Sequence, residues 1–477
     1  MLKLWLRRKK KKIATVLVMC PAWGVLHPPA NLAYLKAFLA GQGLGVKCFD
    51  FNVELYEIFP QKKFWDLNYP EYFIIPHLFS RHIYPVIEKH IDDWAHEILQ
   101  DDPATVGFSL YMSTVNVSVL LAKKLKGLNP HMTLVAGGAE VNRIKKILIE
   151  GVRPATPLNR ELFEVFDLLI DGEGEDGLYE ICRRKDKTRG FHDVPGIVYA
   201  STEKLCAMPP RPLIHDLDSI PFPVFDDFIL KKYITDTLPL VTSRGCVNRC
   251  AFCADSPLWK TYRCMSAEKV VADMKTLAAR YRMNDFEIVD STFNGDISRV
   301  EDMCDLILQK RLKVRWSAKA IVRKEMDFRL LEKMRRAGCV SLAYGIESGS
   351  ESILKDMGKT FSVGLAEKVI RDTHDAGISA NTFFLIGFPT ETDQDFQKTI
   401  VFMKRNARFI QSFAQVTGCH IEEGSSLGMN PERWGIRFEP DGWYSEKSTP
   451  AVRKQRLEEF RKVARQVHRH YVCEVQG

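Results

Sequence analysis

Three cysteines stand close together in the middle of the chain, in the sequence Ser243-Arg-Gly-Cys246-Val-Asn-Arg-Cys250-Ala-Phe-Cys253. Thiolates bind iron and zinc tightly, and a short loop loses little closure entropy when it wraps around a metal centre. Three thiols leave one coordination position open, whereas structural zinc sites usually fill all four. The spacing therefore favours an iron–sulfur cluster with one iron free to bind a substrate. The alternative is a zinc site with a distant fourth ligand, such as Cys264 or a histidine.

The remaining cysteines are scattered on apolar or amphipathic segments, where a buried free thiol is the default. They are Cys20, Cys48, Cys182, Cys206, Cys304, Cys339, Cys419 and Cys473. The role of Cys264 stays undecided at this point.

A repeated alternation of strands and helices surrounds the three clustered cysteines and must position them. Its strands are expected near residues 240–242, 286–290, 314–317, 341–346, 380–386 and 409–417. Six such repeats predict a partial or full β/α barrel over residues 240–420, whose active site lies on the loops that follow the strands. The cysteines occupy the first of these loops.

Residues 13–185 show the same alternation, with a continuous apolar run at 13–19 and helical spacing at 31–40 and 115–128. This pattern predicts a doubly wound, Rossmann-like parallel sheet covered by helices on both faces. Glycines follow two of the expected strands, in Gly137-Gly138 and in Asp171-Gly-Glu-Gly-Glu175. Ligands bind at such strand ends, although simple turns would also explain the glycines.

The chain between the two alternating regions is irregular. Residues 186–239 contain several prolines, which interrupt helices and central strands, so we expect a linker with a short hairpin. A basic tail at 1–12 and a small, basic helical region at 421–477 complete the expected division.

The cysteine spacing resembles the CxxxCxxC signature of the radical S-adenosylmethionine (SAM) superfamily, with Phe252 as the aromatic residue before the last cysteine. The resemblance implies that Cys246, Cys250 and Cys253 hold a 4Fe-4S cluster whose free iron binds the methionine group of SAM. It implies reductive cleavage of SAM to a 5'-deoxyadenosyl radical, with an electron donor such as flavodoxin or ferredoxin. It also implies that Phe252 lies near the adenine.

Three further stretches resemble the branch of this superfamily that includes anaerobic magnesium-protoporphyrin cyclase and cobalamin-dependent methylases. They are Asp290-Ser-Thr-Phe-Asn294, Gly345-Ile-Glu347-Ser348-Gly-Ser-Glu351 and Gly387-Phe-Pro-Thr-Glu391-Thr392. The resemblance implies SAM-binding roles for residues of the first two stretches: Asp290, Asn294, Gly345, Glu347 and Ser348.

The chain departs from this branch at one position. Relatives commonly carry an arginine near the SAM carboxylate, a few residues after a tryptophan of the third strand. Here Trp316 is followed by Lys319 and Arg323, and either could supply the charge. The alternative is that both are surface residues at a strand end.

The first half resembles the cobalamin-binding domain that precedes the radical SAM domain in this branch. The matching segments are Pro28-Pro-Ala-Asn-Leu-Ala-Tyr34-Leu, Gly107-Phe-Ser109-Leu-Tyr111, Gly137-Gly138-Ala-Glu140 and Asp171-Gly172-Glu173-Gly174-Glu175. The resemblance implies that Gly107, Ser109, Gly137, Gly138, Gly172, Glu173 and Gly174 bind the cofactor. The Asp-x-His-x-x-Gly signature of mutase-type domains is absent, so no protein histidine is expected below the corrin. The absence of this signature is also compatible with a domain that has lost cobalamin and kept only its fold, or with a domain that binds substrate.

The resemblance implies methyl transfer from cobalamin to an unactivated carbon or phosphorus centre, started by the radical. A cobalamin-assisted oxidation, cyclisation or ring contraction is the alternative within enzymes. A non-catalytic cobalamin sensor with zinc on the cysteines is the alternative from another class.

Charge and hydropathy limit location and partners. The formal net charge of +8 is concentrated at residues 7–12 and after Pro450. These termini are either solvated or make peripheral contact with an anionic membrane surface. Nucleic-acid binding is disfavoured because no stacking aromatics accompany them. No signal peptide or membrane span is evident, so we expect a cytoplasmic protein with reduced thiols.

Aromatic residues between 64 and 73 offer the only hint of a substrate. Phe64-Trp65, Tyr69 and Tyr72-Phe73 could line an apolar pocket for a lipid-like or isoprenoid small molecule. Ordinary packing is the favoured explanation of these residues.

Overall fold

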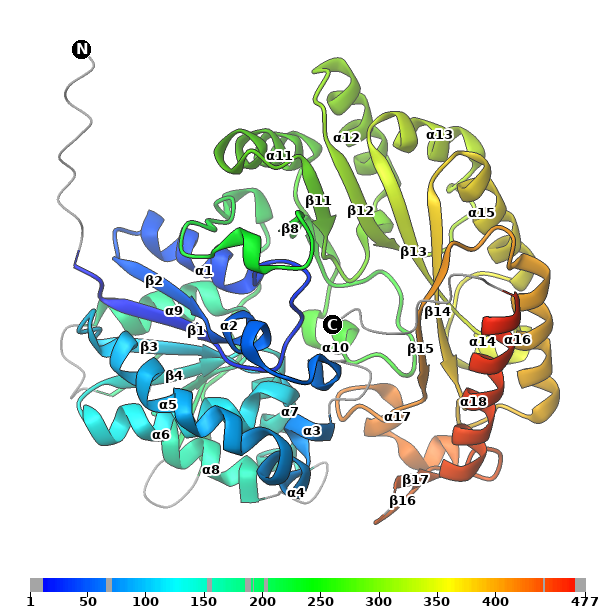
Figure 1. The fold of residues 1–477 in the computed structure, drawn as a ribbon. Helices are drawn as coiled ribbons and strands as arrows, with labels where there is room; N and C mark the ends of the chain where they lie inside the picture. The colour runs from blue at the N-terminus through cyan, green and yellow to red at the C-terminus, as the bar shows by residue number, and fades with distance from the viewer. Residues whose placement is uncertain are drawn as a thin grey trace. The chain divides into compact units, whose positions relative to one another are not determined.

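The structure is a computed structural model that describes residues 12–467, apart from 66–70, 152–156, 185–189, 192, 201–204 and 441. Two compact units divide the chain, one ending at Asp236 and one beginning at Thr237. Each is built around its own parallel sheet (Figure 1). Most of the basic amino-terminal run, Tyr69, Arg469 and Cys473 lie outside the described residues.

The first unit contains a seven-stranded sheet in the order β2-β1-β3-β4-β5-β6-β7. Its strands are β1 (Thr15–Met19), β2 (Val46–Asp50), β3 (Thr105–Ser109), β4 (Thr133–Gly137), β5 (Leu168–Ile170), β6 (Ile197–Ala200) and β7 (Leu205–Ala207). The first five are parallel, and β6 and β7 add an antiparallel hairpin at the edge. The order reverses between β1 and β3, so the predicted doubly wound, Rossmann-like sheet is confirmed.

Helices cover both faces of this sheet (Figure 1). They are α1 (Ala30–Gly41), α2 (Phe51–Ile58), α3 (Glu71–Ile74), α4 (Pro76–Leu78), α5 (Tyr84–Leu99), α6 (Val115–Leu128), α7 (Ala139–Leu148), α8 (Pro157–Val165) and α9 (Gly174–Arg183). Helix α1 packs against α9, while α6 packs against α5 and α8. The apolar run of β1 is buried at all five positions because both faces are covered.

The aromatic segment before α5 belongs to the packed interior of this unit. Phe64, Trp65 and Phe73 are each less than 5% exposed. The Trp65 indole donates to Asn52 Oδ1 at 2.8 Å, and its ring meets that of Phe73 edge to face at 5.3 Å. These residues pack, as one of the two interpretations of the sequence expects.

The second unit contains a six-stranded parallel sheet in the order β15-β14-β13-β12-β11-β8. Its strands are β8 (Leu238–Leu240), β11 (Asp285–Ile288), β12 (Arg315–Ala320), β13 (Cys339–Glu347), β14 (Ser379–Ile386) and β15 (Ser412–Gly418). The order follows the chain without reversal, as in a β/α barrel, and the sheet curves without closing (Figure 1). The predicted partial barrel is confirmed.

Helices and two short hairpins complete the second unit. The helices are α10 (Asp255–Trp259), α11 (Ala267–Tyr281), α12 (Ile297–Gln309), α13 (Phe328–Arg336), α14 (Glu351–Asp356), α15 (Val363–Asp375), α16 (Asp393–Asn406), α17 (Ser426–Met429) and α18 (Pro450–Val467). The hairpins pair β9 (Ser243–Arg244) with β10 (Arg263–Cys264), and β16 (Arg437–Glu439) with β17 (Gly442–Tyr444).

The first strand begins earlier than the sequence suggests. We expected it after Pro239, because proline cannot donate a ladder hydrogen bond, but β8 includes Pro239. Among the described strands it is at the edge of the sheet and pairs with β11. An edge strand has one unpaired side, which tolerates the missing N–H.

Alternating residues decide which face of the second sheet meets the helices. Phe384 of β14 contacts Phe402 of α16 and Phe460 of α18, with ring centroids 6.2 and 5.0 Å apart. The hydroxyls of Tyr344 in β13 and Thr373 in α15 lie 2.9 Å apart. Because strand side chains alternate, Gly345 belongs to the face turned away from these helices. The Glu347 carboxylate lies on the same side, 2.6 Å from where a Cβ on Gly345 would be.

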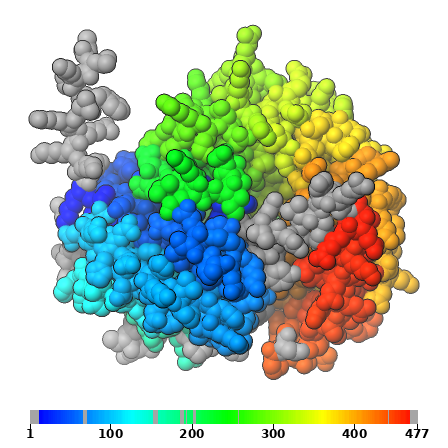
Figure 2. All heavy atoms as spheres, in the orientation of Figure 1, coloured from blue at the N-terminus to red at the C-terminus, as the bar shows by residue number. Residues whose placement is uncertain are grey.

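The predicted carboxy-terminal helix is present as α18, which lies on the surface of the second unit in red (Figure 2). It packs against α16 and β15, and Phe460 is its buried anchor. Within the described part of the chain, none of the helices has the length and apolar character needed to cross a bilayer.

Candidate metal and cofactor site

The cysteine loop leaves the first strand of the second unit and is closed at its base by the hairpin β9–β10. Ser243 pairs with Cys264 in this hairpin, so Cys264 belongs to the ladder at the base of the loop. Gly245, with φ +86°, lies where a Cβ would approach the Thr261 carbonyl oxygen to 2.4 Å. Glycine is therefore needed just before Cys246 for the two arms of the loop to meet.

Asp290, directly after β11, fixes the start of this loop. Its carboxylate accepts hydrogen bonds from the Thr242 N–H (2.7 Å), the Thr242 hydroxyl (2.6 Å) and the Ser243 hydroxyl (2.7 Å). Burial raises the pKa of Asp290 above its usual range, while the nearby Arg299 and these donors oppose the rise. The structure thus shows Asp290 holding the loop; direct contact with SAM remains a prediction.

The sulfur of Cys246 accepts hydrogen bonds in this arrangement. The Thr292 hydroxyl donates to it at 2.8 Å and the Asn248 N–H at 3.4 Å. Donors to sulfur stabilise a thiolate and tune an iron–sulfur cluster. Thr292 lies inside the Asp290–Asn294 stretch, but the sequence did not single it out.

The second half of the loop is held by a segment that follows α14. The Ala251 N–H donates to the Met357 carbonyl at 2.9 Å, and the Thr360 hydroxyl lies 3.4 Å from Asn248 Oδ1. Burial raises the pKa of the Cys250 thiol, and the Lys359 ammonium acts against that rise. A fixed cation therefore stands near these thiols.

The donor set fits an iron–sulfur cluster. Three free thiols, Cys246, Cys250 and Cys253, are partly exposed on one anchored loop. Among the described residues, no group of three or more histidine, cysteine or acidic side chains gathers closely enough to hold a single ion. A four-iron cluster does not require such convergence, because its thiolates bind different irons.

Glu347, Gly345 and Lys359 meet beside the cysteine loop. Lys359 Nζ donates to the Gly345 carbonyl at 3.0 Å and pairs with Glu347 Oε1 at 3.1 Å. Glu347 has φ +65°, a left-handed conformation uncommon outside glycine. A Cβ on Gly345 would lie 2.6 Å from the Glu347 carboxylate, so glycine leaves room for that side chain. Phe252 joins the group, since Lys359 Nζ lies 5.4 Å from its ring centroid.

The residues after Glu347 are anchored on helix α16. Ser348 and the N–H of Gly349 both reach the Thr399 hydroxyl, at 3.1 and 3.0 Å. Ser350 donates to Asp395 at 2.6 Å. Ser348 is fully buried by these contacts, which makes it a support of the Glu347 segment.

Asn294 and Arg323 form a separate cluster, in which Asn294 is fully buried and exchanges hydrogen bonds with the backbone of Ile321 at 2.8 and 2.9 Å. Arg323 donates to the carbonyls of Asn294 (3.2 Å) and Gly295 (2.7 Å). Lys319 is an exposed residue of β12. Burial raises the pKa of the Glu287 carboxyl, and the Lys319 charge opposes that rise. Within the described part of the chain, neither Lys319 nor Arg323 has a hydrogen bond or ion pair to the cysteine loop, so their SAM-binding role stays a prediction.

In the first unit, several predicted cofactor residues gather at the carboxyl ends of neighbouring strands. Ser109 and Gly137 are register partners at the ends of β3 and β4. Gly138, with φ +104°, lies where a Cβ would be 2.6 Å from the Leu110 carbonyl. These positions bring backbone to the sheet edge where doubly wound folds bind ligands.

The other predicted residues of this unit have structural partners. Gly107 lies within β3, where a Cβ would approach Leu17 to 2.9 Å. The Glu173 carboxylate accepts the Ile214 N–H at 2.6 Å. Gly172 has φ +95°, and Gly174 begins α9, so both form the turn after β5.

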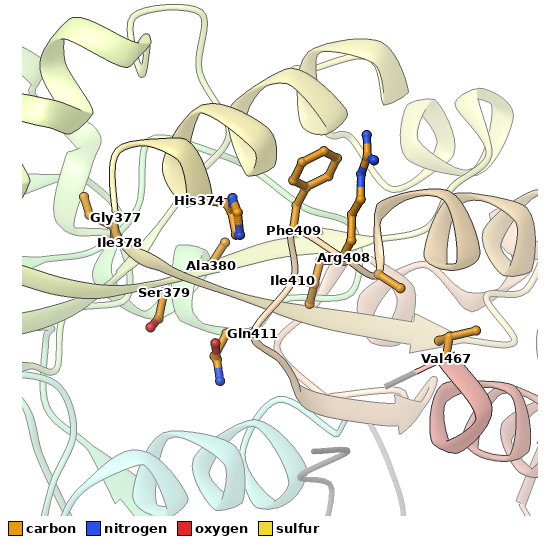
Figure 3. A pocket seen from close by; sticks show the side chains of 11 residues that line it. His374, Gly377, Ile378, Ser379, Ala380, Arg408, Phe409, Ile410, Gln411 and Val467 are labelled. Atoms are coloured by element: carbon orange, nitrogen blue, oxygen red, sulfur yellow. The ribbon is translucent and has the colours of Figure 1, made fainter. Parts of the chain in front are cut away.

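One cavity lies away from all these residues. It has a volume of about 500 Å³ and is lined by His374, Ser379, Phe409, Gln411 and their neighbours (Figure 3). Ser379 begins β14 and Gln411 directly precedes β15, so the cavity lies at the amino ends of the strands. In barrel enzymes the active site lies at the opposite ends.

Known proteins resemble parts of this chain in sequence. The model of the radical SAM superfamily matches residues 240–403. A Pyrococcus horikoshii protein named as an uncharacterised methyltransferase is 31% identical over 317 residues, or 66% of either chain. The anaerobic magnesium-protoporphyrin IX monomethyl ester cyclase of Rubrivivax gelatinosus is 27% identical over 49% of this chain and 44% of its own. The chain thus matches less than two thirds of either relative's length.

Two solved structures share the fold. The methyltransferase TsrM from Kitasatospora setae, solved with cobalamin and an iron–sulfur cluster, has a TM-score of 0.68 and 16% identity, covering 96% of this chain and 89% of its own. OxsB, a cobalamin-dependent radical SAM enzyme, has a TM-score of 0.65 and 16% identity, covering 89% and 56%. The family model thus identifies residues 240–403 as a radical SAM domain, which contains the three cysteines of the loop.

Proposed function

We propose that this protein is a cobalamin-dependent radical SAM enzyme that methylates an unactivated carbon or phosphorus centre. The observation that carries the proposal is the anchored loop with Cys246, Cys250 and Cys253, at the carboxyl end of the first strand of a partial β/α barrel. In this proposal the three thiols hold a 4Fe-4S cluster, and Phe252, Gly345 and Glu347 contribute to the SAM site.

The protein's own contribution is positioning. When bound, the cluster supplies the electron that cleaves SAM, and cobalamin supplies the methyl group. Asp290 and Thr292 hold the first thiol, while the Met357–Thr360 segment holds the second half of the loop. Helix α16 keeps the Glu347 segment in place through Ser348 and Gly349. Such pre-organisation spares the site from rearranging during the reaction.

Cobalamin binding is supported by the first unit. Its parallel strands follow the order 2-1-3-4-5, and such sheets bind ligands beyond the carboxyl ends at the switch point. Ser109, Gly137 and Gly138 are at these ends. The structural relatives TsrM and OxsB are both named with cobalamin. A domain that kept the fold without the cofactor is the alternative.

The finer division of the chain also belongs to this proposal. We assign cobalamin binding to residues 13–185, SAM chemistry to 240–420 and a supporting role to 421–477. The compact first unit includes much of the proposed linker 186–239, whose hairpin β6–β7 extends the first sheet.

The substrate is proposed to be a small molecule, and the electron donor a flavodoxin or ferredoxin in the cytoplasm. Binding to anionic vesicles tests the alternative that the basic termini contact a membrane surface.

Anaerobic reconstitution with iron and sulfide tests the cluster. We expect visible sulfur-to-iron charge-transfer absorption and about four irons per chain by elemental analysis. One zinc per chain without that absorption would eliminate the radical mechanism and favour the non-catalytic sensor. The matched control is the triple variant Cys246→Ala, Cys250→Ala, Cys253→Ala.

Methyl-deuterated SAM tests the reaction. Reconstituted enzyme with reductant and cobalamin is incubated with polar and lipid extracts, and products are analysed by mass spectrometry. We expect 5'-deoxyadenosine together with label in a product. Formation of 5'-deoxyadenosine and an unlabelled changed product would instead support an oxidation, cyclisation or ring contraction.

A further inference from the structure

Thr292 places a hydroxyl against the first cysteine of the loop. It is only 1% exposed, and its Oγ1 lies 2.8 Å from Cys246 Sγ. The Ser291 carbonyl also lies within reach of this hydroxyl, at 2.9 Å. A hydroxyl has a single proton to donate, so the two acceptors compete for it. A sulfur that carries negative charge is the stronger acceptor, because hydrogen bonds to ionised groups are stronger than neutral ones.

The surroundings of Thr292 fix the direction of this hydroxyl. The Thr292 backbone is extended, with φ −153°, and its carbonyl lies 3.0 Å from the Ser243 hydroxyl. Phe293, next in the chain, is fully buried, and its ring centroid lies 5.2 Å from that of Trp316. Threonine is also β-branched, which restricts the rotation of its side chain. The hydroxyl therefore meets the Cys246 sulfur from a rigid support just after β11.

A backbone donor reaches the same sulfur from within the loop. The Asn248 N–H donates to Cys246 Sγ at 3.4 Å, and Asn248 is itself 6% exposed. A substitution can remove the Thr292 hydroxyl but leaves the Asn248 N–H in place. Thr292 is thus the donor whose effect on the sulfur can be measured separately.

We propose that the Thr292 hydroxyl raises the reduction potential of the iron–sulfur cluster and so eases its reduction by a one-electron carrier. The assignment rests on the proposed function, because it presupposes that Cys246 is a cluster ligand. When one electron passes from the carrier to the cluster, part of the added negative charge lies on the ligand sulfurs. The O–H group stabilises that charge, so the reduced form gains more from this hydrogen bond than the oxidised form.

Thr292→Val removes the hydroxyl and nearly keeps the shape of the side chain. The full-length protein is reconstituted anaerobically, and a redox titration followed by electron paramagnetic resonance of the reduced cluster gives the midpoint potential. We expect the equilibrium constant for reduction to fall about tenfold, the order expected when a hydrogen bond to a charged group is lost. For a one-electron couple this makes the potential about 59 mV more negative.

Two further variants accompany this measurement. Thr292→Ser keeps the hydroxyl and should stay close to the wild-type potential. Thr382→Val, in β14, is the matched control, because Thr382 is fully buried and its hydroxyl has no hydrogen-bond partner among the described residues. This control should have the wild-type potential. Iron content is measured in each variant, and Thr292→Ala replaces Thr292→Val if that variant does not load iron.

Two results would overturn the assignment. One is a midpoint potential in Thr292→Val, or in its substitute, that equals or exceeds the wild-type value. The other is an equal fall in Thr292→Ser or Thr382→Val, which would trace the change to packing and not to the hydroxyl. Failure of the proposed function has a different signature, in which the wild-type protein itself assembles no iron–sulfur cluster.

Discussion

The Asp290 carboxylate accepts three hydrogen bonds from the two residues that lead into the cysteine loop, and Asp290 is only 2% exposed. Arg299 completes this cluster by donating to the Thr242 hydroxyl at 3.0 Å and to the Phe293 carbonyl at 2.6 Å. A buried carboxylate with so many donors sets the geometry of the chain around it. The position of Cys246 thus depends on a residue that follows a different strand, β11.

Replacing Asp290 with alanine should therefore disturb cluster assembly. Three donors lose their acceptor and Arg299 loses its nearby carboxylate, at a cost of about 3 kcal/mol in the free energy of unfolding. We expect lower iron and sulfide content after reconstitution and a lower melting temperature. Asp255→Ala removes an exposed carboxylate near the same loop, one that accepts a hydrogen bond from the Ser291 hydroxyl at 2.9 Å, and should leave both quantities unchanged. Full iron content in Asp290→Ala would contradict this prediction.

Residues differ in how visible their roles are in the sequence. The three cysteines could be found because their spacing is local. Lys359 could not, because its partner Glu347 lies 12 residues away and nothing in the intervening sequence marks a lysine as buried. Gly107 is the opposite case. It lies in a segment that matches cobalamin-binding domains, yet close packing against Leu17 is enough to explain why a glycine is needed there.

Helix α16 supports the segment after Glu347 by unusually close packing. A Cβ on Gly349 would lie 2.6 Å from Phe402 Cβ and 2.8 Å from the Lys398 carbonyl oxygen. Asp395, in the first turn of the helix, accepts from Ser350 and Ser352 at 2.6 and 2.8 Å. Burial would raise the pKa of Asp395, but these hydroxyls and Thr392 hold it below its usual range.

Gly349→Ala should push this segment away from α16. The backbone atoms of the helix cannot shift easily to make room. The overpacking should therefore lower the free energy of unfolding by about 1 to 3 kcal/mol and weaken SAM binding. Gly364→Ala is the control, because Gly364 is in helix α15 with open space around its Cα, where alanine should stabilise by up to about 1 kcal/mol. Thermal unfolding and SAM dialysis measure both effects. Unaltered SAM affinity in Gly349→Ala would show that α16 does not position the site.

Helix α18 is joined to the turn after β14 by a buried ion pair, Arg456 with Glu391, at 3.2 Å. Burial raises the pKa of Glu391 to about 7 from its ordinary 4.5, although Arg456 opposes the rise. Between these values the folded protein binds more protons than the unfolded chain. This contribution to stability is therefore present below about pH 4.5 and lost as the pH rises through about 7.

Glu391→Gln should remove that dependence. The wild-type free energy of unfolding should decline with rising pH across this window by roughly 3 kcal/mol more than that of the variant. Denaturant unfolding at several pH values between 5 and 8 measures the difference. Glu439→Gln, in the exposed strand β16, is the control and should follow the wild type. Parallel wild-type and Glu391→Gln curves would show that the Glu391 carboxyl does not titrate there.

Elements were predictable where propensity and pattern agreed. The structure reproduces the expected elements at 31–40, 115–128 and 380–386 as α1, α6 and β14. The first barrel strand was misplaced because Pro239 suggests a break, and only the neighbouring strands reveal that β8 is an edge. The order of strands in a sheet depends on contacts between segments far apart in the chain, and local sequence patterns do not specify those contacts.

At the scale of the molecule, the residues proposed for the two kinds of cofactor belong to different compact units. The glycine-rich strand ends lie in the unit that ends at Asp236, and the cysteine loop lies in the unit that begins at Thr237. Each unit has its own sheet and its own buried core. A domain with its own core can form its ligand site without the other.

We therefore expect the protein to load cobalamin and iron independently. The triple cysteine-to-alanine variant should hold no cluster but keep wild-type cobalamin per chain after desalting, measured by absorbance. Gly137→Ala should do the reverse: its Cβ would make only ordinary contact with Ile170 at 3.9 Å, so the fold tolerates it, while the methyl group obstructs a corrin at the strand end. We expect about tenfold weaker cobalamin binding with unchanged iron. Loss of both groups in either variant would show instead that one site must form before the other.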